Sequence, residues 1–259
     1  MTSRLGLGLP AGGRPAYLPP GRPRGPGAVP SPEAPESRVH MLLDEAYGAG
    51  IRYVDVARSY GRAEEFAARW LGARGRTDVE VGSKWGYRYV GDWQLDAEVH
   101  EVKDHSVGAL REQWPLSRHL LGDRLGRYLV HSATLDSGAL TDAELHRELA
   151  RVRATGVRVG ISTSGPRQAD AVRTALAVEV DGEPLFTAFQ VTWNLLDPSV
   201  GPAAAEAAAV GAQVVVKEAV ANGRLVGGGE GADAAAAVAR RAGLPIDRLA
   251  TAAALAQPW

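Results

Sequence analysis

The sequence predicts an α/β protein with a parallel sheet, and two observations support this fold class. From residue 37 onward, short apolar runs typical of buried strands alternate with longer amphipathic stretches typical of helices. Polar or ionisable residues stand at the C-terminal ends of successive strands, which is where parallel α/β proteins place their chemistry. The alternation fits an open doubly wound sheet, but the number of units fits a (β/α)8 TIM barrel better.

The predicted elements follow one another in regular order along the chain. Strands are expected over residues 4–9, 51–56, 79–84, 127–131, 157–162, 186–193 and 212–217. Helices are expected over residues 37–48, 63–71, 101–114, 141–154, 167–178, 202–210, 232–242 and 246–256.

Residue types that begin or end helices set several of these boundaries. Gly72 and Pro115 directly follow two predicted helices, and both types commonly stop a helix. Thr141 with Glu144 three residues later matches a capping box, in which each side chain binds a free backbone N–H of the first turn. We therefore expect the next helix to begin at Thr141.

The stretch over residues 10–36 is rich in proline and glycine and is expected to be an irregular loop. Gly6, Gly8 and Ala11 fit the G-x-G-x-x-A spacing of a dinucleotide-binding turn. That motif requires a helix to start there, and Gly12 and Gly13 argue against one. The segment is therefore not assigned as a dinucleotide-binding turn.

Composition excludes several classes of protein. The 259 residues carry a net charge of −1, which argues against a general nucleic-acid binder. The absence of cysteine excludes disulfides, thiolate metal sites and a cysteine nucleophile. No apolar run is long enough to cross a membrane or to act as a signal peptide. We expect one domain over residues 1–259, a cytoplasmic location, and no metal, membrane or nucleic-acid partner.

Four residues at three strand ends suggest proton-transfer chemistry. Asp55 ends the strand over 51–56, and Tyr60 follows in a loop that Gly61 can turn. Lys84 and His131 end two later strands. Each has an ordinary structural explanation alone: a turn aspartate, a half-buried tyrosine, a lysine at the rim, a core histidine. The parallel arrangement brings such strand ends to one edge of the sheet, which favours a common site.

The chemistry that this set supports is protonation of a forming alkoxide. A tyrosine phenol has a pKa near 10 and transfers protons poorly at neutral pH, but a nearby ammonium favours the phenolate. Lys84 can supply that ammonium to Tyr60, and Asp55 can keep the lysine charged. His131 can donate a hydrogen bond to a carbonyl oxygen and orient it. No side chain can supply hydride, so a nicotinamide cofactor is implied.

These segments resemble the aldo-keto reductase family over roughly residues 4–259. The run over 50–64 (GIRYVDVARSYGRAE) resembles the family's Asp-and-Tyr signature, Ser-Lys-Trp (83–85) its lysine strand, and Tyr-Leu-Val-His-Ser (128–132) its histidine strand. The resemblance implies a barrel that uses NADPH, with NADH not excluded, to reduce an aldehyde or ketone. It implies that Tyr60 is the general acid, that Lys84 and Asp55 tune it, and that His131 orients the carbonyl.

The resemblance also implies cofactor-binding residues in the second half of the chain. Ser162 and Gln190 match positions that hold the nicotinamide carboxamide, and Thr163 stands where the family more often has asparagine or arginine. The segment over 216–225 resembles the loop beside the pyrophosphate. There the expected contacts are Lys217, Glu218, Ala219, Val220, Asn222 and Arg224. Lys217 and Glu218 replace the family's usual aromatic residue and serine.

The chain ends at Trp259, where an eighth strand and a segment for the adenosine 2′-phosphate are expected. We therefore predict a C-terminally truncated family member, an incomplete barrel without its last β/α unit, or one whose missing unit a partner chain supplies. An alternative function follows: a catalytically impaired nucleotide-binding or regulatory barrel without this cofactor clamp. An unrelated barrel lyase or isomerase would leave the four strand-end residues unexplained.

Aromatic residues near strand ends are candidates for a substrate pocket. Trp85 and Trp193 are the expected contacts to a small carbonyl compound, and Tyr87 and Trp93 lie in the same kind of segment. Each can equally be a packing residue.

Overall fold

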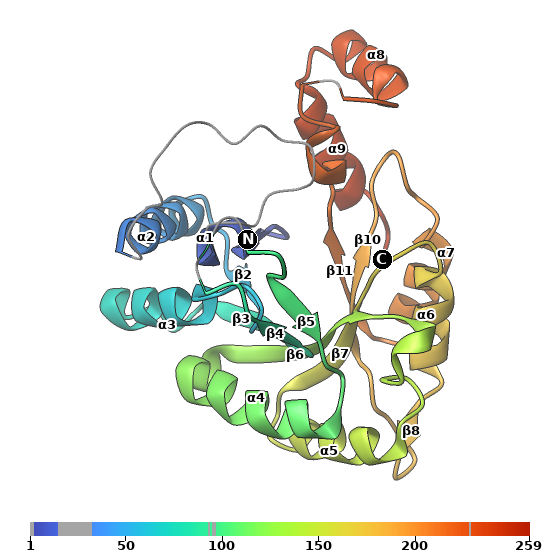
Figure 1. The fold of residues 1–259 in the computed structure, drawn as a ribbon. Coiled ribbons are helices and arrows are strands. Elements are labelled where there is room, and N and C mark those ends of the chain that lie inside the picture. The colour runs from blue at the N-terminus through green and yellow to red at the C-terminus, as the bar shows by residue number, and fades with distance from the viewer. Residues whose placement is uncertain (1–2, 15–32, 93, 95–96, 228) are drawn as a thin grey trace. The chain divides into compact units, whose positions relative to one another are not determined.

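A computed structural model describes residues 3–14, 33–92, 94, 97–227 and 229–259 (Figure 1). The chain forms two compact units. The N-terminal unit comprises Met1–His131 and Asp142–Val159, and the C-terminal unit comprises Ser132–Thr141 and Gly160–Trp259. The expectation of one domain over 1–259 stays a prediction.

Parallel strands form the centre of the N-terminal unit. They are β1 (Gly6–Gly8), β2 (Tyr53–Asp55), β3 (Glu80–Trp85) and β6 (Leu125–Ala133), of which the last two residues of β6 belong to the C-terminal unit. Each strand pairs with the next in that order. The register sets Asp55 opposite Gly82 and Lys84 opposite Leu129. Two of the predicted proton-transfer residues therefore lie on adjacent strands.

Helices and one hairpin complete this unit. The helices are α1 (Pro10–Gly13), α2 (Glu33–Gly48), α3 (Ala63–Arg74), α4 (Val107–Leu121) and α5 (Ala143–Arg153), with the 3-10 turn η1 (Gly122–Arg124) after α4. An antiparallel hairpin of β4 (Tyr87–Tyr89) and β5 (Glu101–Lys103) follows β3. Helix α4 packs on β3 and against its neighbours α3 and α5. The buried faces are apolar, as the fully buried Phe66, Trp70 and Leu110 show.

The C-terminal unit repeats the same plan. Parallel strands β7 (Arg158–Thr163) and β11 (Gln213–Lys217) flank β10 (Ala188–Thr192), and β8 (Glu179–Val180) forms a hairpin with β9 (Glu183–Pro184). The helical elements are η2 (Leu135–Ser137), α6 (Gln168–Leu176), α7 (Gly201–Ala209), η3 (Ala221–Gly223), α8 (Asp233–Arg241) and α9 (Ile246–Leu255). Helix α7 packs on β10, β11 and α6, and α8 packs on α9 (Figure 1).

The predicted strands all form, each within a few residues of the expected bounds. The helix expected over 101–114 is wrong at both ends. Residues 101–103 belong to the hairpin, and α4 begins only after Ser106, whose Oγ accepts from the Ala109 amide at 3.1 Å. Pro115 lies inside α4. Its ring removes one helical hydrogen bond, but buried side chains on both sides, Gln113 and Ser117, hold the helix in place.

Three other boundaries differ from the sequence-based expectation. Gly72 does not end α3, which continues to Arg74 and is capped by Gly75 in the left-handed conformation. Helix α5 is capped by Asp142, not by Thr141, because the Asp142 carboxylate accepts from the amides of Glu144 and Leu145. The loop expected over 10–36 is wrong at both ends, where α1 and the start of α2 are helical, and residues 15–32 lie outside the described residues. Helix α1 has Pro10 in its first turn, a favourable position, but its four residues are too few for a dinucleotide-binding helix.

None of the helices in the described ranges is long and apolar enough to cross a membrane.

Candidate active site

The four predicted proton-transfer residues come together in the N-terminal unit. The Lys84 Nζ donates to Asp55 Oδ2 at 2.6 Å, to the Val56 carbonyl at 2.9 Å and to the Tyr60 hydroxyl at 3.3 Å. An ammonium has three hydrogens, so these three acceptors satisfy it completely. Lys84 is 1% exposed, and such a buried charge is tolerated only with a partner of opposite sign. The carboxylate of Asp55 is that partner.

Tyr60 lies between Lys84 and His131. Its ring meets the His131 ring edge-to-face, with centroids 5.5 Å apart, and its oxygen accepts from Lys84. A phenol oxygen that accepts one hydrogen bond still donates through its own O–H. Tyr60 and His131 are 6% and 9% exposed, so both are largely removed from bulk water. The arrangement can deliver a proton from Tyr60 next to a hydrogen-bond donor.

Close backbone packing fixes the loop that carries Tyr60. The Arg62 amide donates to the Gly13 carbonyl at 2.8 Å. A Cβ on Gly13 would lie 1.9 Å from the Tyr60 carbonyl oxygen, and one on Gly61 would lie 2.4 Å from the Gly13 carbonyl oxygen. Gly61 also has φ +59°, a conformation that favours glycine. Only glycine at both positions lets the N-terminal segment hold the Tyr60 loop this closely.

A buried ion pair anchors the other side of this loop. The Glu64 carboxylate, 2% exposed, pairs with the Arg58 guanidinium and accepts from Ser83 Oγ at 2.5 Å and from Ser117 Oγ at 2.7 Å. The Arg58 amide donates to the Lys84 carbonyl at 2.9 Å. The loop is therefore tied to β3 and α4 by charge-assisted bonds.

Residues that the sequence interpretation missed surround the four. Tyr53 donates to Asp55 Oδ1 at 3.2 Å; burial raises its pKa, so it stays a donor. Ser59 Oγ contacts His131 Nδ1 at 3.3 Å. His105 Nε2 donates to the His131 carbonyl at 2.8 Å. Ser59 adjoins Tyr60 in sequence, which is a usable signal, whereas nothing in the sequence separates His105 from the other histidines.

Burial keeps His105 neutral at physiological pH. Removal from water lowers the pKa of its imidazole to about 4, and the bond to the His131 carbonyl opposes this only in part. Its ring also lies against Tyr87, and Tyr87 contacts the His131 ring with centroids 5.0 Å apart. Tyr87 thus shares the immediate surroundings of His131, whereas the predicted contact Trp85 is fully buried.

The predicted carboxamide contacts lie in the C-terminal unit, with Ser162 and Thr163 at the end of β7 and Gln190 in the middle of β10. Ser162 stands opposite Gln190 in the register, and both are nearly fully buried. Ser162 Oγ accepts from the Ser132 amide at 2.8 Å. The Thr163 hydroxyl donates to Gln168 Oε1 at 3.1 Å, a buried glutamine that the sequence interpretation did not single out.

The predicted pyrophosphate loop follows β11 in the same unit. Lys217 Nζ donates to Thr192 Oγ1 at 2.6 Å and to Glu218 Oε1 at 2.7 Å, so the acidic residue is neutralised within the chain. Glu218, Ala221 and Asn222 have positive φ values of 59°, 51° and 53°. This conformation costs an L-residue roughly 1 kcal/mol or more, and such strain is concentrated at functional sites.

Backbone amides of this loop are candidates for phosphate binding. Among the described residues, no backbone carbonyl accepts from the amides of Ala219, Val220 or Asn222. The Arg224 side chain is exposed at the end of the loop. Unpaired amides beside cations fit a phosphate group.

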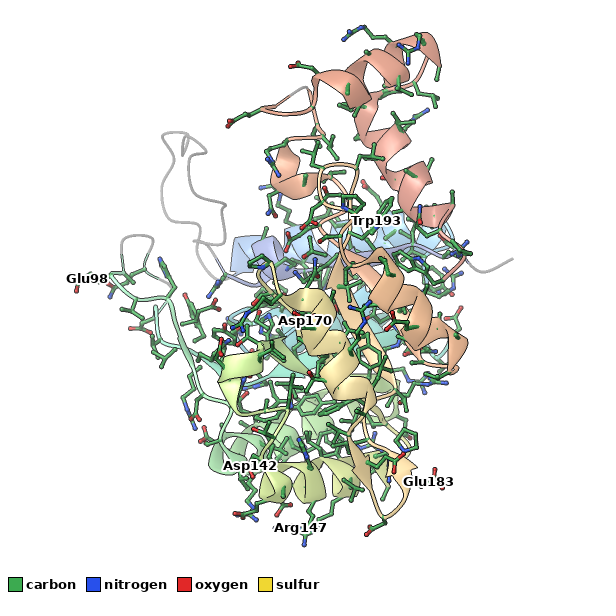
Figure 2. The ribbon with its side chains drawn as sticks, turned by 90° about the vertical axis from the view of Figure 1, so that its right-hand side faces the viewer. Glu98, Asp142, Arg147, Asp170, Glu183 and Trp193 are labelled. Carbon is green, nitrogen blue, oxygen red and sulfur yellow. The ribbon has the colours of Figure 1, made fainter. Side chains whose placement is uncertain are left out.

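Trp193 and Asn194 directly follow β10. Asn194 Nδ2 donates to the Glu218 carbonyl at 3.1 Å and so braces the pyrophosphate loop. The predicted substrate residue Trp193, labelled in Figure 2, is 6% exposed and its ring contacts that of Trp259. Trp93 lies outside the described residues.

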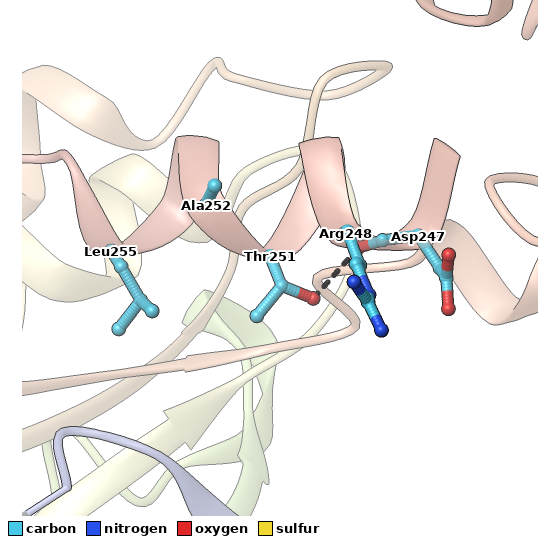
Figure 3. A pocket seen from close by; sticks show the side chains of 5 residues that line it. All are labelled: Asp247, Arg248, Thr251, Ala252 and Leu255. Atoms are coloured by element: carbon cyan, nitrogen blue, oxygen red, sulfur yellow. Dashed lines mark hydrogen bonds between the residues drawn. The ribbon is translucent and has the colours of Figure 1, made fainter. Parts of the chain in front are cut away.

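Each unit has a cavity lined by described residues. In the N-terminal unit, about 290 Å³ lies next to the Tyr60 loop, lined by Gly61, Arg62, Tyr89, Val90 and Asp92. In the C-terminal unit, about 260 Å³ runs along one side of α9, lined by Asp247, Arg248, Thr251, Ala252 and Leu255 (Figure 3). The first cavity is lined by Gly61, which follows the candidate general acid Tyr60 in the sequence. The second is bounded by a single helix, where the Thr251 hydroxyl donates to the Asp247 carbonyl.

Comparison with known proteins decides the family. The model of the aldo/keto reductase family matches residues 26–256. This chain belongs to the aldo/keto reductase family. Its members are NAD(P)-dependent oxidoreductases of carbonyl compounds, and the chain is an oxidoreductase of this class. No curated protein matches the chain in sequence.

Solved structures of the family are similar in fold. A Pseudomonas aeruginosa protein assigned to the aldo-keto reductases is 27% identical, with a TM-score of 0.63, over 86% of this chain and 75% of its own. A Gluconobacter oxydans glycerol dehydrogenase is 21% identical, with a TM-score of 0.67, over 99% of this chain and 80% of its own. A Bacillus halodurans aldo-keto reductase in its holo form is 22% identical, with a TM-score of 0.70, over 99% of this chain and 79% of its own. These likenesses confirm the predicted TIM-barrel fold class.

Proposed function

We propose that this aldo/keto reductase transfers hydride between NADPH and a small aldehyde or ketone, with Tyr60 as the general acid. Lys84 and Asp55 tune Tyr60, and His131 orients the carbonyl oxygen. The expected location is the cytoplasm. The observation that carries the proposal is the unbroken chain of hydrogen bonds from Asp55 through Lys84 to the Tyr60 hydroxyl, beside the His131 ring.

The residues of the N-terminal unit handle the proton. The Tyr60 O–H donates to the substrate oxygen as negative charge develops there. The Lys84 ammonium, 3.3 Å from the phenol oxygen, stabilises the negative charge that the departing proton leaves on it. Asp55 offsets the cost of keeping the ammonium buried. A neutral His131 donates a second hydrogen bond to the substrate oxygen and stabilises the same charge.

The residues of the C-terminal unit would hold the nicotinamide cofactor, which supplies the hydride when bound. Ser162, Thr163 and Gln190 would contact the carboxamide. The amides of Ala219, Val220 and Asn222, with Lys217 and Arg224, would bind phosphate. The unpaired amides support this assignment, and Glu218 is compatible with it because Lys217 neutralises the carboxylate.

The substrate is proposed to lie beside Tyr87 and within the cavity that adjoins Gly61 and Arg62. The predicted contacts Trp85 and Trp193 are both largely buried, so we propose that they shape the surroundings of the substrate by packing.

Two assays on the purified chain test this function. NADPH oxidation is followed across a panel of aldehydes and ketones, and cofactor binding is followed by fluorescence titration. Tyr60→Phe removes the proton donor and is expected to lower kcat by about 10³-fold while the cofactor Kd stays the same. The half-buried Tyr47, whose hydroxyl bonds to Asp78 and to no other described residue, provides the control Tyr47→Phe, which should retain full turnover. Full turnover in Tyr60→Phe would refute the assignment.

A regulatory or nucleotide-binding role without useful catalysis is the second candidate. The acidic Glu218 on the proposed phosphate loop favours it, because a carboxylate there competes with phosphate for the Lys217 ammonium. The same two assays separate the candidates. Cofactor binding without turnover on any carbonyl compound in the panel would favour the second.

A further inference from the structure

The Ser59 hydroxyl is a buried group that the proposed mechanism does not use. Its Oγ lies 3.3 Å from Nδ1 of His131, and the residue is 1% exposed. Ser59 directly precedes Tyr60, so one short loop carries both the proposed acid and the group that touches the carbonyl-orienting histidine.

The loop holds Ser59 in a fixed position. The Arg58 amide donates to the Lys84 carbonyl, and the Tyr60 amide donates to the Ala57 carbonyl at 3.0 Å. The backbone on the other side of the contact is also held, because His105 donates to the His131 carbonyl. Neither partner can easily turn away, and the contact is a property of the folded site.

The direction of this hydrogen bond follows from the needs of the serine. A hydroxyl buried without an acceptor costs about 1–3 kcal/mol. Within the described residues, the only hydrogen-bond partner of Ser59 Oγ is His131 Nδ1. The hydroxyl is satisfied as a donor only if it donates to Nδ1, and Nδ1 accepts only when it carries no hydrogen.

We propose that Ser59 is a positioning residue that selects the His131 tautomer with hydrogen on Nε2. A neutral imidazole with a bare Nδ1 carries its hydrogen on Nε2. That nitrogen can then donate to a substrate carbonyl oxygen, whereas the other tautomer would present a lone pair and repel it. The inference rests on the proposed role of His131 in carbonyl reduction and adds a residue to it.

Nitrogen NMR on the histidine-labelled wild-type chain reads the tautomer directly. Long-range ¹H–¹⁵N correlation distinguishes a bare from a protonated ring nitrogen, and the His131 signals are those lost in His131→Gln. We expect a bare Nδ1 and a protonated Nε2 at neutral pH. A protonated Nδ1 in the wild-type chain would overturn the proposal, and this measurement needs no substituted serine and no turnover.

Substitution of Ser59 tests the consequence. Ser59→Ala should populate both tautomers and lower kcat by about tenfold at an unchanged cofactor Kd, the size expected for one hydrogen bond. Ser59→Thr keeps the hydroxyl and should restore the wild-type tautomer. The control is Ser137→Ala, because the Ser137 hydroxyl bonds to the Thr134 backbone within the turn η2 and belongs to none of the proposed catalytic or binding groups. This variant should change neither the His131 tautomer nor kcat.

The outcomes separate this proposal from the proposed function. If the wild-type chain reduces no carbonyl compound but shows the bare Nδ1, the function fails and the tautomer assignment stands. If turnover is normal and Ser59→Ala leaves both the tautomer and kcat unchanged, Ser59 has only a packing role.

Discussion

The two units hold their candidate functional groups in different ways. In the N-terminal unit, the candidate groups bond to one another within the chain. The Lys84 ammonium donates its three hydrogens to the Asp55 carboxylate, the Val56 carbonyl and the Tyr60 hydroxyl. In the C-terminal unit, the proposed phosphate loop offers backbone amides held in a strained conformation around Ala221. The first arrangement is complete within the chain, and the second has hydrogen bonds left to make with a ligand.

This difference indicates a division of work. A buried, internally satisfied network keeps its geometry whether or not a ligand is present, which suits proton transfer. Unpaired amides gain their partners only on binding, which suits recognition of a phosphate. Substitutions in the first region should therefore change kcat, and substitutions in the second should change cofactor affinity.

The largest effect is expected from Lys84→Met. The change removes the ammonium beside the Tyr60 hydroxyl and leaves Asp55 without its cation, and kcat should fall by about 10³-fold. The Kd of NADPH, measured by fluorescence titration, should remain within about twofold of the wild-type value. A loss of cofactor binding with normal kcat at saturation would remove the proposed division between the units.

The next effect is a pH dependence of stability that arises in the N-terminal unit. Burial lowers the pKa of His105 to about 4, so the unfolded chain takes up this proton at a higher pH than the folded one. Stability is therefore retained above about pH 6.5 and lost as the pH falls toward 4, by at most about 3 kcal/mol.

Urea unfolding of the wild type and His105→Gln at pH 7 and pH 4.5 isolates this contribution, because glutamine can keep the bond to the His131 carbonyl without titrating. We expect the variant to lose less stability than the wild type over this interval. Equal losses of unfolding free energy in the wild type and in His105→Gln would contradict the assignment of this pH dependence to His105.

Sequence reasoning performed best where the chemistry lies in ionisable side chains on strands. Asp55, Tyr60, Lys84 and His131 could be grouped because parallel strands bring their ends to one edge and their charges complement one another. The structure places all four in contact. The positions of the parallel strands needed no more than the alternation of apolar runs and helical stretches.

The features that could not be predicted depend on tertiary packing. Pro115 lies inside α4, where side chains on both sides of it are buried. Asp142, not Thr141, accepts from the first amides of α5. The left-handed conformation of Ala221 has no signal in the residue type. The position of His105 beside the site depends on tertiary structure, because its imidazole donates to the His131 carbonyl, 26 residues away in the sequence.

In the C-terminal unit, Lys217→Met should weaken NADPH binding by about tenfold and leave kcat at saturating cofactor unchanged. The change removes a cation and releases Glu218 from its ion pair, which adds a free negative charge near the proposed phosphates. Glu218→Gln, measured by the same titration, should bind NADPH slightly more tightly. Weaker binding in Glu218→Gln would show that the carboxylate contributes to recognition.

The smallest effect is expected from Ala221→Gly. Glycine relieves the strain of the positive φ, but it gives up a methyl group buried with Leu225, Ala232 and Ala250 and adds freedom to the unfolded chain. These terms oppose one another, so the free energy of unfolding should change by less than about 0.5 kcal/mol. The control Ala205→Gly, at an exposed position within α7, should cost about 1 kcal/mol.

Cofactor affinity is the more informative measurement on Ala221→Gly. If the strained loop is preorganised for phosphate, a flexible glycine raises the entropy lost on binding, and the Kd of NADPH should rise by about threefold. The same change in a loop that binds nothing would leave the Kd constant. A constant Kd together with a weakened Lys217→Met would assign recognition to the lysine side chain and leave the strained backbone with a role in folding alone.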